Sequence, residues 1–479
     1  MTMSLRMGAH RQPDDHDEWA TWALDGVAHR PFWTDRSDAP PVNPLLSEDT
    51  EADVLVIGGG LTGLWAAILA AEEASGRRIV LIESERIAHG ASGRNGGFIS
   101  SSLTHGLAHG EALWPREMPT LVRLGRENLQ EITSFLRDED IDADLRICGK
   151  TAIATTDHAL RGLGALSSTH RRWDEDCELL DKDAMQADVA SPTYLGGLRI
   201  RGASGLMDPA RMTWGLQRAA LRRGVQIYEQ TPAMSLAADR QVVRVQTPHG
   251  GIHARQVVLA TNGYRPLLAR LRRRILPVFD HVLVTEPIAE SDMARVGWLE
   301  QQGLTDLGNQ FHYYRRIGNR ILWGGYDAIY YRGNRTDPTL EHRDASHHLL
   351  ARQFRETFPQ LSDVRFSHKW AGIIDSTSRF TPAIGHCGHG RVGYAVGFTG
   401  LGTASSRFAA QTVLDLLAGR DTERTRLTMV RRKPFPFPSE PVRYPLVQFT
   451  RGRLAREDRT GRRGAWLRLL DSLGLGFNS

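Results

Sequence analysis

The chain has few cysteines. Cys148, Cys177 and Cys387 are the only three in 479 residues, and their spacing matches no metal-binding pattern. An odd and sparse cysteine count argues against a disulfide-rich secreted domain and is typical of a reducing compartment. The N-terminal sequence MTMSLRMGAHRQPDDHDEW has no apolar segment, which argues against a secretory signal. We therefore expect a cytoplasmic protein with no metal site.

The chain also lacks a clear membrane span. The uncharged stretch VLVIGGGLTGLWAAILAA, residues 54–71, has the length of a span. Three glycines interrupt it, with β-branched residues before them and alanines after them. This pattern favours a strand, a turn and a helix, so we expect no transmembrane segment.

Excess charge is missing from most of the chain. The net charge is +5, and residues 451–479 alone hold seven arginines against Glu457, Asp458 and Asp471. The remainder is nearly neutral, which argues against nucleic-acid binding. An apolar cluster between Trp466 and Leu473 follows the basic residues. Because this cluster is short, we expect it to dock on the protein's own surface and not on a membrane.

A glycine-rich turn follows the first strand that the sequence predicts. Residues 54–57 are continuously apolar, as expected of a strand buried on both faces of a parallel sheet. Gly58, Gly60 and Gly63 then fit the pattern G-x-G-x-x-G and open an apolar helix. Glu83 lies 20 residues after Gly63, at the end of a second apolar strand, where an acid binds a ribose in dinucleotide-binding folds. These features predict a dinucleotide-binding βαβ unit, and the acid disfavours NADP.

A second glycine-rich stretch, GASGRNGG at residues 90–97, follows the same unit. Glycine in this density costs conformational entropy, so we expect something other than protein to approach the backbone closely. The stretch would emerge at the carboxyl edge of the sheet, beside the dinucleotide. A nicotinamide enzyme has no evident use for it, whereas an extended flavin can lie along bare backbone. We therefore favour FAD over NAD.

Five motifs together resemble the D-amino-acid oxidase superfamily of FAD enzymes. They are, in order, VIGGGLTGL, VLIESERIAHGASGRNGG, VVLATNGY, WAGIIDSTSRFTPAIG and VGFTGLGT. The superfamily includes glycine oxidase, sarcosine oxidase and gamma-glutamylputrescine oxidase. The GASGRNGG form, the KPFPFPSEP connector and the LGLGFNS ending resemble the gamma-glutamylputrescine oxidase and glycine oxidase-like branch in particular. The resemblance is specific for the fold and the cofactor, and much less so for the substrate.

The resemblance implies which residues bind the cofactor. The first glycine motif would hold the pyrophosphate, Glu83 the adenosine ribose, and the backbone near Ala233 the adenine. The stretch GASGRNGG would run beside the flavin, and the segment from Gly397 would close over its ring. The full set is Gly58, Gly60, Leu61, Thr62, Gly63, Glu83, Ser84, Ala91, Ser92, Gly93, Arg94, Asn95, Gly96, Gly97, Ala233, Thr261, Asn262, Gly263, Gly372, Gly397, Phe398, Thr399, Gly400, Leu401, Gly402 and Thr403.

Covalent attachment of the flavin is not expected. Covalent members of the superfamily carry a Cys shortly before the segment that matches RFTPAIG, or a His near the glycine strip. Ile373 and Ile374 stand near the first position, and Arg94 and Asn95 near the second. We therefore expect non-covalent FAD.

The fold class that follows is α/β, or α+β overall. It combines a doubly wound, Rossmann-type FAD-binding domain with an inserted antiparallel-sheet substrate domain. A chain of 479 residues exceeds what one core usually holds. The predicted parts are an N-terminal arm (1–50), an FAD-binding domain in three segments (51–145, 208–274, 370–425), a substrate domain in two segments (146–207, 275–369), and a C-terminal connector with the basic tail (426–479).

The resemblance implies oxidation of a C–N bond in a small-molecule amine or amino acid. Hydride would pass to flavin N5, the imine would hydrolyse, and O2 would reoxidise the flavin to give H2O2. Two alternatives stay open: a flavin dehydrogenase that passes electrons to a partner, and a non-catalytic dinucleotide-binding regulator. Candidates for substrate binding are Tyr313, Arg315, Trp323, Tyr326 and His281, because arginine can anchor a carboxylate and aromatic rings can enclose an amine. Each also fits an ordinary place in a strand.

Overall fold

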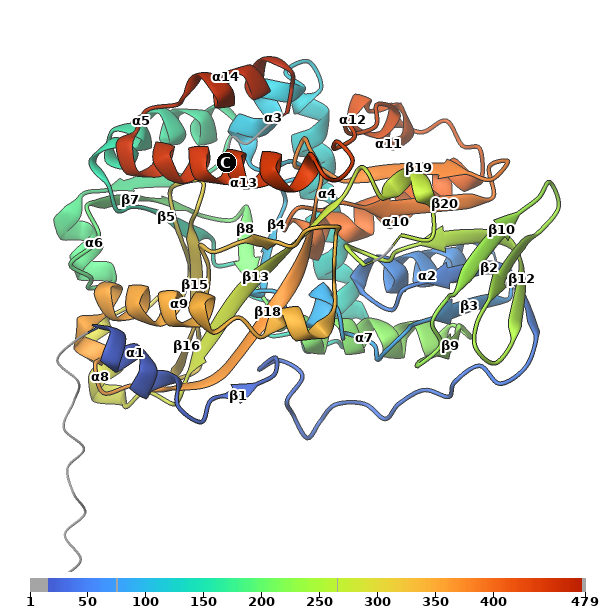
Figure 1. Cartoon of the computed structure of the whole chain (residues 1–479), viewed down its shortest axis with the longest axis horizontal. Helices are drawn as coiled ribbons and strands as arrows, with labels where there is room; N and C mark the ends of the chain where they lie inside the picture. The colour runs from blue at the N-terminus through green and yellow to red at the C-terminus, as the bar shows by residue number, and fades with distance from the viewer. Residues whose placement is uncertain (1–15, 75, 265, 476–479) are drawn as a thin grey trace, which may run out of the picture.

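The structure is a computed structural model that describes residues 16–74, 76–264 and 266–475. Two large mixed sheets lie next to each other, the ten-stranded sheet on the left of Figure 1 and the eight-stranded sheet on the right. A two-stranded sheet of β4 (Phe98–Ser100) and β8 (Ser204–Leu206) is separate from both. The chain passes between the two large sheets several times, so each is built from distant segments.

The eight-stranded sheet has a parallel centre. Its parallel strands run in the order β9 (Gln226–Tyr228), β3 (Ile79–Ile82), β2 (Thr50–Ile57), β12 (Gly251–Leu259) and β20 (Val392–Val396). The antiparallel additions are β19 (Ala383–Cys387) on β20, and β10 (Ser235–Ala238) with β11 (Val243–Gln246) on the first half of β12.

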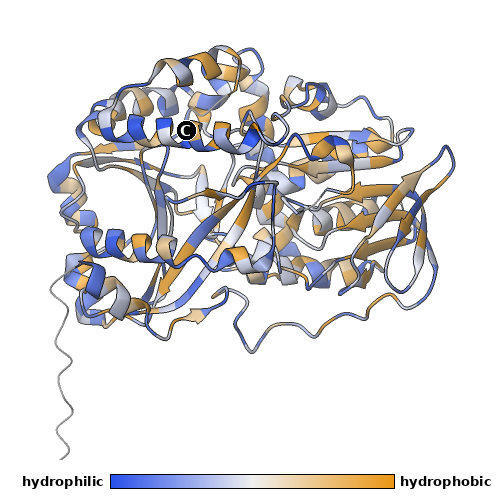
Figure 2. Cartoon of the chain, viewed as in Figure 1, coloured by the Kyte–Doolittle hydropathy of each residue, from blue (hydrophilic) through white to orange (hydrophobic). Residues whose placement is uncertain are grey.

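Apolar side chains on both faces of β2 explain how this sheet is covered. Val54 and Val56 pack among the helices, whereas Leu55 and Ile57 belong to a separate core cluster on the other face. The helices of the first face are α2 (Leu61–Glu73), α7 (Pro209–Arg222), α10 (Gly402–Leu417) and α4 (Met118–Asp138). The other face packs mainly against β10, β11 and nearby loops. Apolar residues are dense along these strands in Figure 2.

The stretch 54–71 thus forms part of β2, a turn and part of α2, as predicted. Most of its side chains are buried, on one face of the sheet or the other. Nowhere in the described ranges does a helix combine the length and the apolar content that crossing a membrane requires.

The ten-stranded sheet is largely antiparallel. Its order is β1 (Ala28–His29), β18 (Phe366–Ser376), β13 (Leu276–Thr285), β16 (Arg320–Gly325), β15 (His312–Ile317), β14 (Gly303–Asp306), β5 (Lys150–Ala154), β7 (Gly196–Ile200) and β6 (Cys177–Leu180), with β17 (Ile329–Tyr330) on β13. Only the pairs β1–β18 and β14–β5 are parallel. The predicted α/β fold, with one parallel and one largely antiparallel sheet, is confirmed.

The two faces of this second sheet have different neighbours. Val282 and Val284 of β13 share a core with α2 and α7, and we call this side the inner face. Leu283 packs with α9 (Asp344–Thr357) and α1 (His16–Leu24), and we call this side the outer face. Successive residues of a strand alternate between the two faces.

One predicted domain boundary needs correction. The third FAD-binding segment was predicted to begin at residue 370, but β18 continues to Ser376 in the ten-stranded sheet. Its register against β13 runs from Phe366 opposite Thr285 to Ser376 opposite Leu276. The chain therefore leaves this sheet only after Ser376.

The remaining described helices are α3 (Leu107–Leu113), α5 (Asp157–Arg172), α6 (Lys182–Asp188), α8 (Glu290–Val296), α11 (Glu423–Arg426), α12 (Thr428–Arg431), α13 (Arg443–Thr460) and α14 (Ala465–Ser472).

The N-terminal segment is bound along both sheets. Trp19 of α1 is fully buried, and its indole N–H donates to the carbonyl of Ser362 at 2.6 Å. Further along, the indole N–H of Trp33 donates to the carbonyl of Asn95 at 2.8 Å. The segment therefore contacts the glycine stretch itself, which the sequence alone did not indicate.

The C-terminal helices α13 and α14 pack on the rest of the protein, at the top of Figure 1. Leu467 is fully buried, whereas Leu469 is 50% exposed. The Asp458 carboxylate accepts hydrogen bonds from the backbone N–H groups of Asn309 and Gln310, at 2.8 and 2.9 Å. The structure thus places the tail as expected, on the protein's own surface. Residues 476–479 of the LGLGFNS motif lie outside the described residues.

A pair of substitutions tests this docking. Leu467→Ala is expected to lower the free energy of unfolding by about 2–5 kcal/mol, because it empties a fully buried site. The matched change Leu469→Ala, at an exposed site of the same helix, should cost less than about 0.5 kcal/mol. Urea denaturation measures both. If the wild-type protein binds anionic liposomes and Leu469→Ala weakens that binding, the result contradicts docking and favours membrane contact.

Candidate active site

Four of the predicted cofactor motifs each begin where a parallel strand ends. Gly58 follows β2, Glu83 follows β3, Thr261 lies just beyond β12, and Gly397 follows β20. The carboxyl ends of parallel strands meet at one edge of a sheet, which is where open α/β sheets bind their ligands. The structure therefore brings these motifs together.

The G-x-G-x-x-G turn requires its glycines for steric reasons. Gly58 has φ of 115°, and a Cβ there would lie 2.4 Å from the carbonyl oxygen of Ala260. A Cβ at Gly63 would lie 1.8 Å from the carbonyl oxygen of Gly58. Among the described residues, none accepts a hydrogen bond from the backbone N–H of Gly60, Thr62 or Gly63. These free N–H groups at the start of α2 fit a pyrophosphate.

Glu83 lies beside this turn. Its carboxylate accepts hydrogen bonds from the N–H of Gly59 at 2.6 Å and from the N–H of Glu85 at 3.0 Å. The Ser84 hydroxyl donates to the same carboxylate at 3.1 Å. The backbone carbonyl of Glu83 accepts from Thr231 at 2.8 Å, which draws the segment before Ala233 toward the same edge.

The glycine strip, residues 90–97, docks on the first motif. The Ser92 hydroxyl accepts a hydrogen bond from the N–H of Leu61 at 2.9 Å. A Cβ added at Gly93 would lie 2.1 Å from the carbonyl oxygen of Ala88. At Gly96 it would lie 2.5 Å from the Tyr313 ring, and at Gly97 it would lie 2.4 Å from the carbonyl oxygen of Met207. Protein atoms thus account for these three glycines. Contacts with nearby Ala88 and with the distant Tyr313 and Met207 are therefore enough to require glycine at these positions, whether or not a bound group also approaches them.

Side chains inside the strip fix its conformation. The Asn95 amide donates to the carbonyl of Ala91 at 2.9 Å and accepts from the N–H of Gly97 at 2.8 Å. The buried Arg94 guanidinium donates to the carbonyl of Ala371 at 2.9 Å and to the Glu341 carboxylate at 2.5 Å. The strip is therefore tied to β18, a strand of the other sheet.

The turn after β12 also rests on β18. Asn262 has φ of 49°, and its side-chain amide donates to the carbonyl of Ile373 at 3.1 Å. A Cβ at Gly263 would lie 2.7 Å from the Ile373 side chain. Gly372, the next residue back, faces Arg94, since its Cβ would lie 3.4 Å from the Arg94 Cβ. Both sheets therefore contribute to the site.

The segment Gly397–Thr403 contacts β18 and β4. The Asp375 carboxylate accepts the N–H groups of Gly397 and, at 3.0 Å, of Phe398. Burial raises the pKa of this carboxyl to about 7. The Thr403 hydroxyl donates to the carbonyl of Phe98, just after the glycine strip, at 2.7 Å. Asp375 was missed from the sequence because a lone acid in a strand forms no motif.

Two predicted substrate residues lie on the inner face. The Tyr313 ring packs on Gly96, and its hydroxyl donates to the Asp280 carboxylate at 2.6 Å. Arg315 is fully buried and donates to the carbonyl oxygens of Met207 at 2.6 Å and Gly97 at 3.2 Å. Its guanidinium supports the strip and is not free for a substrate carboxylate, which corrects that expectation. Burial lowers the Arg315 pKa to about 10.

The other three predicted substrate residues belong to the outer face. Trp323 stacks on His312, with ring centroids 4.5 Å apart, in the core beneath α9. Tyr326 also stacks on His312, at 5.0 Å, and His281 contacts His347 of α9 edge-on. These three side chains point away from the glycine strip. For Trp323 and His281, strand alternation explains the error, since their neighbours in sequence point to the inner face instead.

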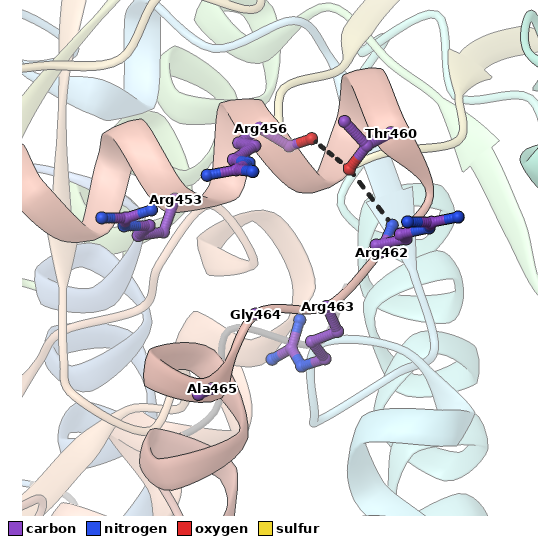
Figure 3. Close-up of a pocket in the computed structure, with 7 residues that line it drawn as sticks. All are labelled: Arg453, Arg456, Thr460, Arg462, Arg463, Gly464 and Ala465. Carbon is purple, nitrogen blue, oxygen red and sulfur yellow. Dashed lines mark hydrogen bonds between the residues drawn. The ribbon is translucent and has the colours of Figure 1, made fainter.

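A surface hollow of about 530 Å³ lies elsewhere, between α13 and α14 (Figure 3). Its lining residues are Arg453, Arg456, Thr460, Arg462, Arg463, Gly464 and Ala465. None of them belongs to the predicted cofactor set. The hollow is therefore separate from the motifs described above.

Comparison with known proteins agrees with this geometry. Residues 53–416 match the family model DAO, described as FAD dependent oxidoreductase. The chain is 30% identical over 437 residues to Gamma-glutamylputrescine oxidoreductase of Escherichia coli K12, covering 90% of this chain and 95% of the relative. It is 28% identical over 389 residues to Probable oxidoreductase OrdL of Haemophilus influenzae, covering 79% and 85%. Among solved structures, glycine oxidase from Geobacillus kaustophilus has a TM-score of 0.64 at 21% identity, covering 78% of this chain and 96% of that one.

Proposed function

Since the chain belongs to the DAO family of FAD dependent oxidoreductases, we propose that it oxidises a carbon–nitrogen bond in a small-molecule amine or amino acid. The cofactor is FAD, as in the family. Gamma-glutamylputrescine oxidoreductase and glycine oxidase, two of the relatives, take their names from nitrogen compounds of these two kinds. We assign the substrate class to this chain on the basis of that similarity.

We propose that FAD lies along the carboxyl edge of the eight-stranded sheet. The free N–H groups of Gly60, Thr62 and Gly63 would hold its pyrophosphate, and Glu83 its ribose. The ring would then lie beside the glycine strip and in front of the N-terminus of α10. The single observation that carries this proposal is the meeting of all these motifs at one edge.

When bound, FAD would supply the oxidant, accepting hydride at N5 from the carbon bonded to nitrogen and passing the electrons to O2 as H2O2. The resulting imine would hydrolyse in water. The task of this chain is to place the substrate carbon in front of the ring. The inner face of the ten-stranded sheet lies across the glycine strip from the first sheet, so it supplies the opposite wall of the site.

The reaction is tested by anaerobic mixing of the purified holoprotein with a panel of polyamines, amino acids and N-methyl amino acids. Loss of the visible flavin absorption, followed by H2O2 release when air is admitted, is the expected result. Bleaching without H2O2 would instead favour a dehydrogenase with a protein partner. If every compound leaves the absorption unchanged while dithionite bleaches it, the result favours a non-catalytic dinucleotide-binding regulator.

The mode of attachment has a direct test. Because no Cys or His stands at the attachment positions of the covalent members, acid denaturation should release all the flavin into the supernatant. Cys387 is the last residue of β19 and pairs with Val392 at the start of β20. Gly397 follows the other end of β20, so the two residues lie at opposite edges of the sheet. Yellow colour that stays with the precipitated protein would contradict non-covalent binding.

Glu83→Ala should weaken FAD binding roughly ten- to a hundredfold, because hydrogen bonds to a charged acceptor contribute about 1.5–3 kcal/mol. The measurement is titration of FAD into apoprotein. Glu85→Ala is the matched control, since Glu85 is exposed two residues away and should leave the affinity unchanged. An unaltered affinity in Glu83→Ala would refute the ribose role.

A further inference from the structure

One buried carboxylate in this protein lacks a partner that could balance its charge. Six carboxylate residues are buried among those the structure describes. Five of them either pair with an arginine or accept two backbone N–H groups: Asp208, Glu229, Asp327, Asp375 and Asp415. The sixth is Asp280, whose single side-chain hydrogen-bond partner in the described chain is the neutral hydroxyl of Tyr313, 2.6 Å from Oδ2.

The environment of Asp280 makes the lack of a cationic partner energetically unfavourable. No Lys, Arg or His among the described residues lies within 4.0 Å of its carboxylate. An unpaired charge is strongly disfavoured inside a protein. Burial raises the Asp280 pKa to about 6, and Asp327 also raises it, whereas Tyr313, His312 and the backbone N–H of His281 lower it. No described side chain donates a hydrogen bond to the second oxygen, Oδ1, so it is available to a ligand.

Asp280 faces the glycine strip. It lies opposite Gly372 in the β13–β18 register, and Gly372 in turn faces Arg94. Tyr313, its hydrogen-bond partner, packs on Gly96. Asp280 keeps 8% of its surface exposed, whereas its neighbours Phe279 and His281 are at 0%. That remaining exposure is therefore on the inner face, toward the proposed position of the flavin ring.

The arginines near the strip are already engaged. Arg94 donates to two carbonyl oxygens and to Glu341, and Arg315 donates to the carbonyl oxygens of Gly97 and Met207. Neither presents a free guanidinium for a substrate carboxylate. Next to Gly96, Asp280 is the charged group of the described chain that has no ion-pair partner, so this part of the wall fits a cation.

Building on the proposed function, we propose that Asp280 binds the substrate's ammonium group and accepts its proton, and that the substrate is an amine without a carboxylate on the reacting carbon. In this step one N–H bond breaks, its electron pair stays on nitrogen, and the proton bonds to Oδ1 of Asp280. Ammonium and carboxylate become neutral amine and carboxylic acid, with no change in oxidation state. The Tyr313 hydroxyl holds the other oxygen and so orients the carboxylate.

Binding is tested with tert-butylammonium, which has no hydrogen on the carbon bonded to nitrogen and so cannot be oxidised there. It is titrated into the oxidised holoenzyme and followed by the change in the flavin spectrum. Asp280→Asn should weaken its binding about tenfold or more, because a charge-assisted hydrogen bond is lost. The matched control Asp306→Asn removes an acid of the outer face, which contacts His312 and Tyr314, and should leave binding unchanged. No binding to the wild type, or equal binding to Asp280→Asn, overturns the proposal.

Turnover tests the substrate class with pairs such as butylamine and norvaline, which differ by one carboxylate. The amine should have the higher kcat/KM, and Asp280→Asn should lower it about a hundredfold or more. Preference for norvaline overturns the proposal. If tert-butylammonium binds through Asp280 but no amine bleaches the flavin, the proposed oxidation fails while the cation site stands.

Tyr313→Phe is the second variant, in case Asp280→Asn does not retain FAD. It removes a hydrogen bond that lowers the Asp280 pKa, so that pKa rises. The acidic limb of the kcat/KM profile for the amine should therefore move to higher pH. The other charged or titratable groups around Asp280, namely His312, Asp327 and Arg94, are unchanged in this variant. An acidic limb that stays in place contradicts the role of Asp280.

Discussion

Replacing Gly63 by alanine is expected to abolish FAD binding. The added Cβ would lie 1.8 Å from the carbonyl oxygen of Gly58, and backbone cannot yield as a flexible side chain does. The start of α2 must therefore move away from β2, which displaces the free N–H groups of Gly60, Thr62 and Gly63 from the pyrophosphate position. We expect the purified variant to be colourless.

Gly164→Ala is the control for this change. Gly164 lies in α5, and a Cβ there meets no atom within 4 Å. Alanine in a helix interior is favoured over glycine by roughly 0.5–1 kcal/mol, so this variant should keep its FAD and be slightly more stable. FAD content per chain and urea denaturation measure both variants. Stoichiometric FAD in Gly63→Ala would show that the first glycine motif does not bind the cofactor.

Replacing Arg315 by methionine should detach the glycine strip from the ten-stranded sheet. The guanidinium donates to the carbonyl oxygens of Gly97 and Met207, and each such bond contributes about 1.5–3 kcal/mol. If the free energy of even one of these hydrogen bonds is lost entirely from cofactor binding, the FAD affinity falls roughly ten- to a hundredfold. Arg315→Lys should be intermediate, because one ammonium cannot reproduce the planar fork of donors.

Arg316→Met is the matched control, since this neighbouring side chain points to the opposite face and donates to the carbonyl of Trp298. Its FAD affinity, measured by titration into apoprotein, should equal that of the wild type. Equal affinity in Arg315→Met would mean that the buried guanidinium has no part in positioning the strip.

The cofactor side of the site could be predicted from the sequence because its motifs are local. Gly58, Glu83 and Gly397 each stand directly after an apolar run, and parallel strands place such positions at one edge. Spacing along the chain was therefore enough to bring them together.

The opposite wall could not be predicted in the same way. Strand periodicity shows that Trp323 and Arg315 alternate with their neighbours, but not which face meets the flavin domain. The glycines of residues 90–97 were attributed to a bound group, yet their neighbours include Met207 and Tyr313, which are more than a hundred residues away in sequence. Asp280 and Asp375 are single acids within strands. Only their burial and their hydrogen-bond partners, which the structure shows, distinguish them from the other acids of the chain.

The crystal structure of the protein with FAD bound tests the central claim most directly. The account predicts the pyrophosphate at the N–H groups of Gly60, Thr62 and Gly63, and the flavin ring beside the glycine strip and in front of the N-terminus of α10, with Asp280 facing it. FAD at any other edge of the sheet, or a ring separated from Asp280 by other side chains, would contradict it.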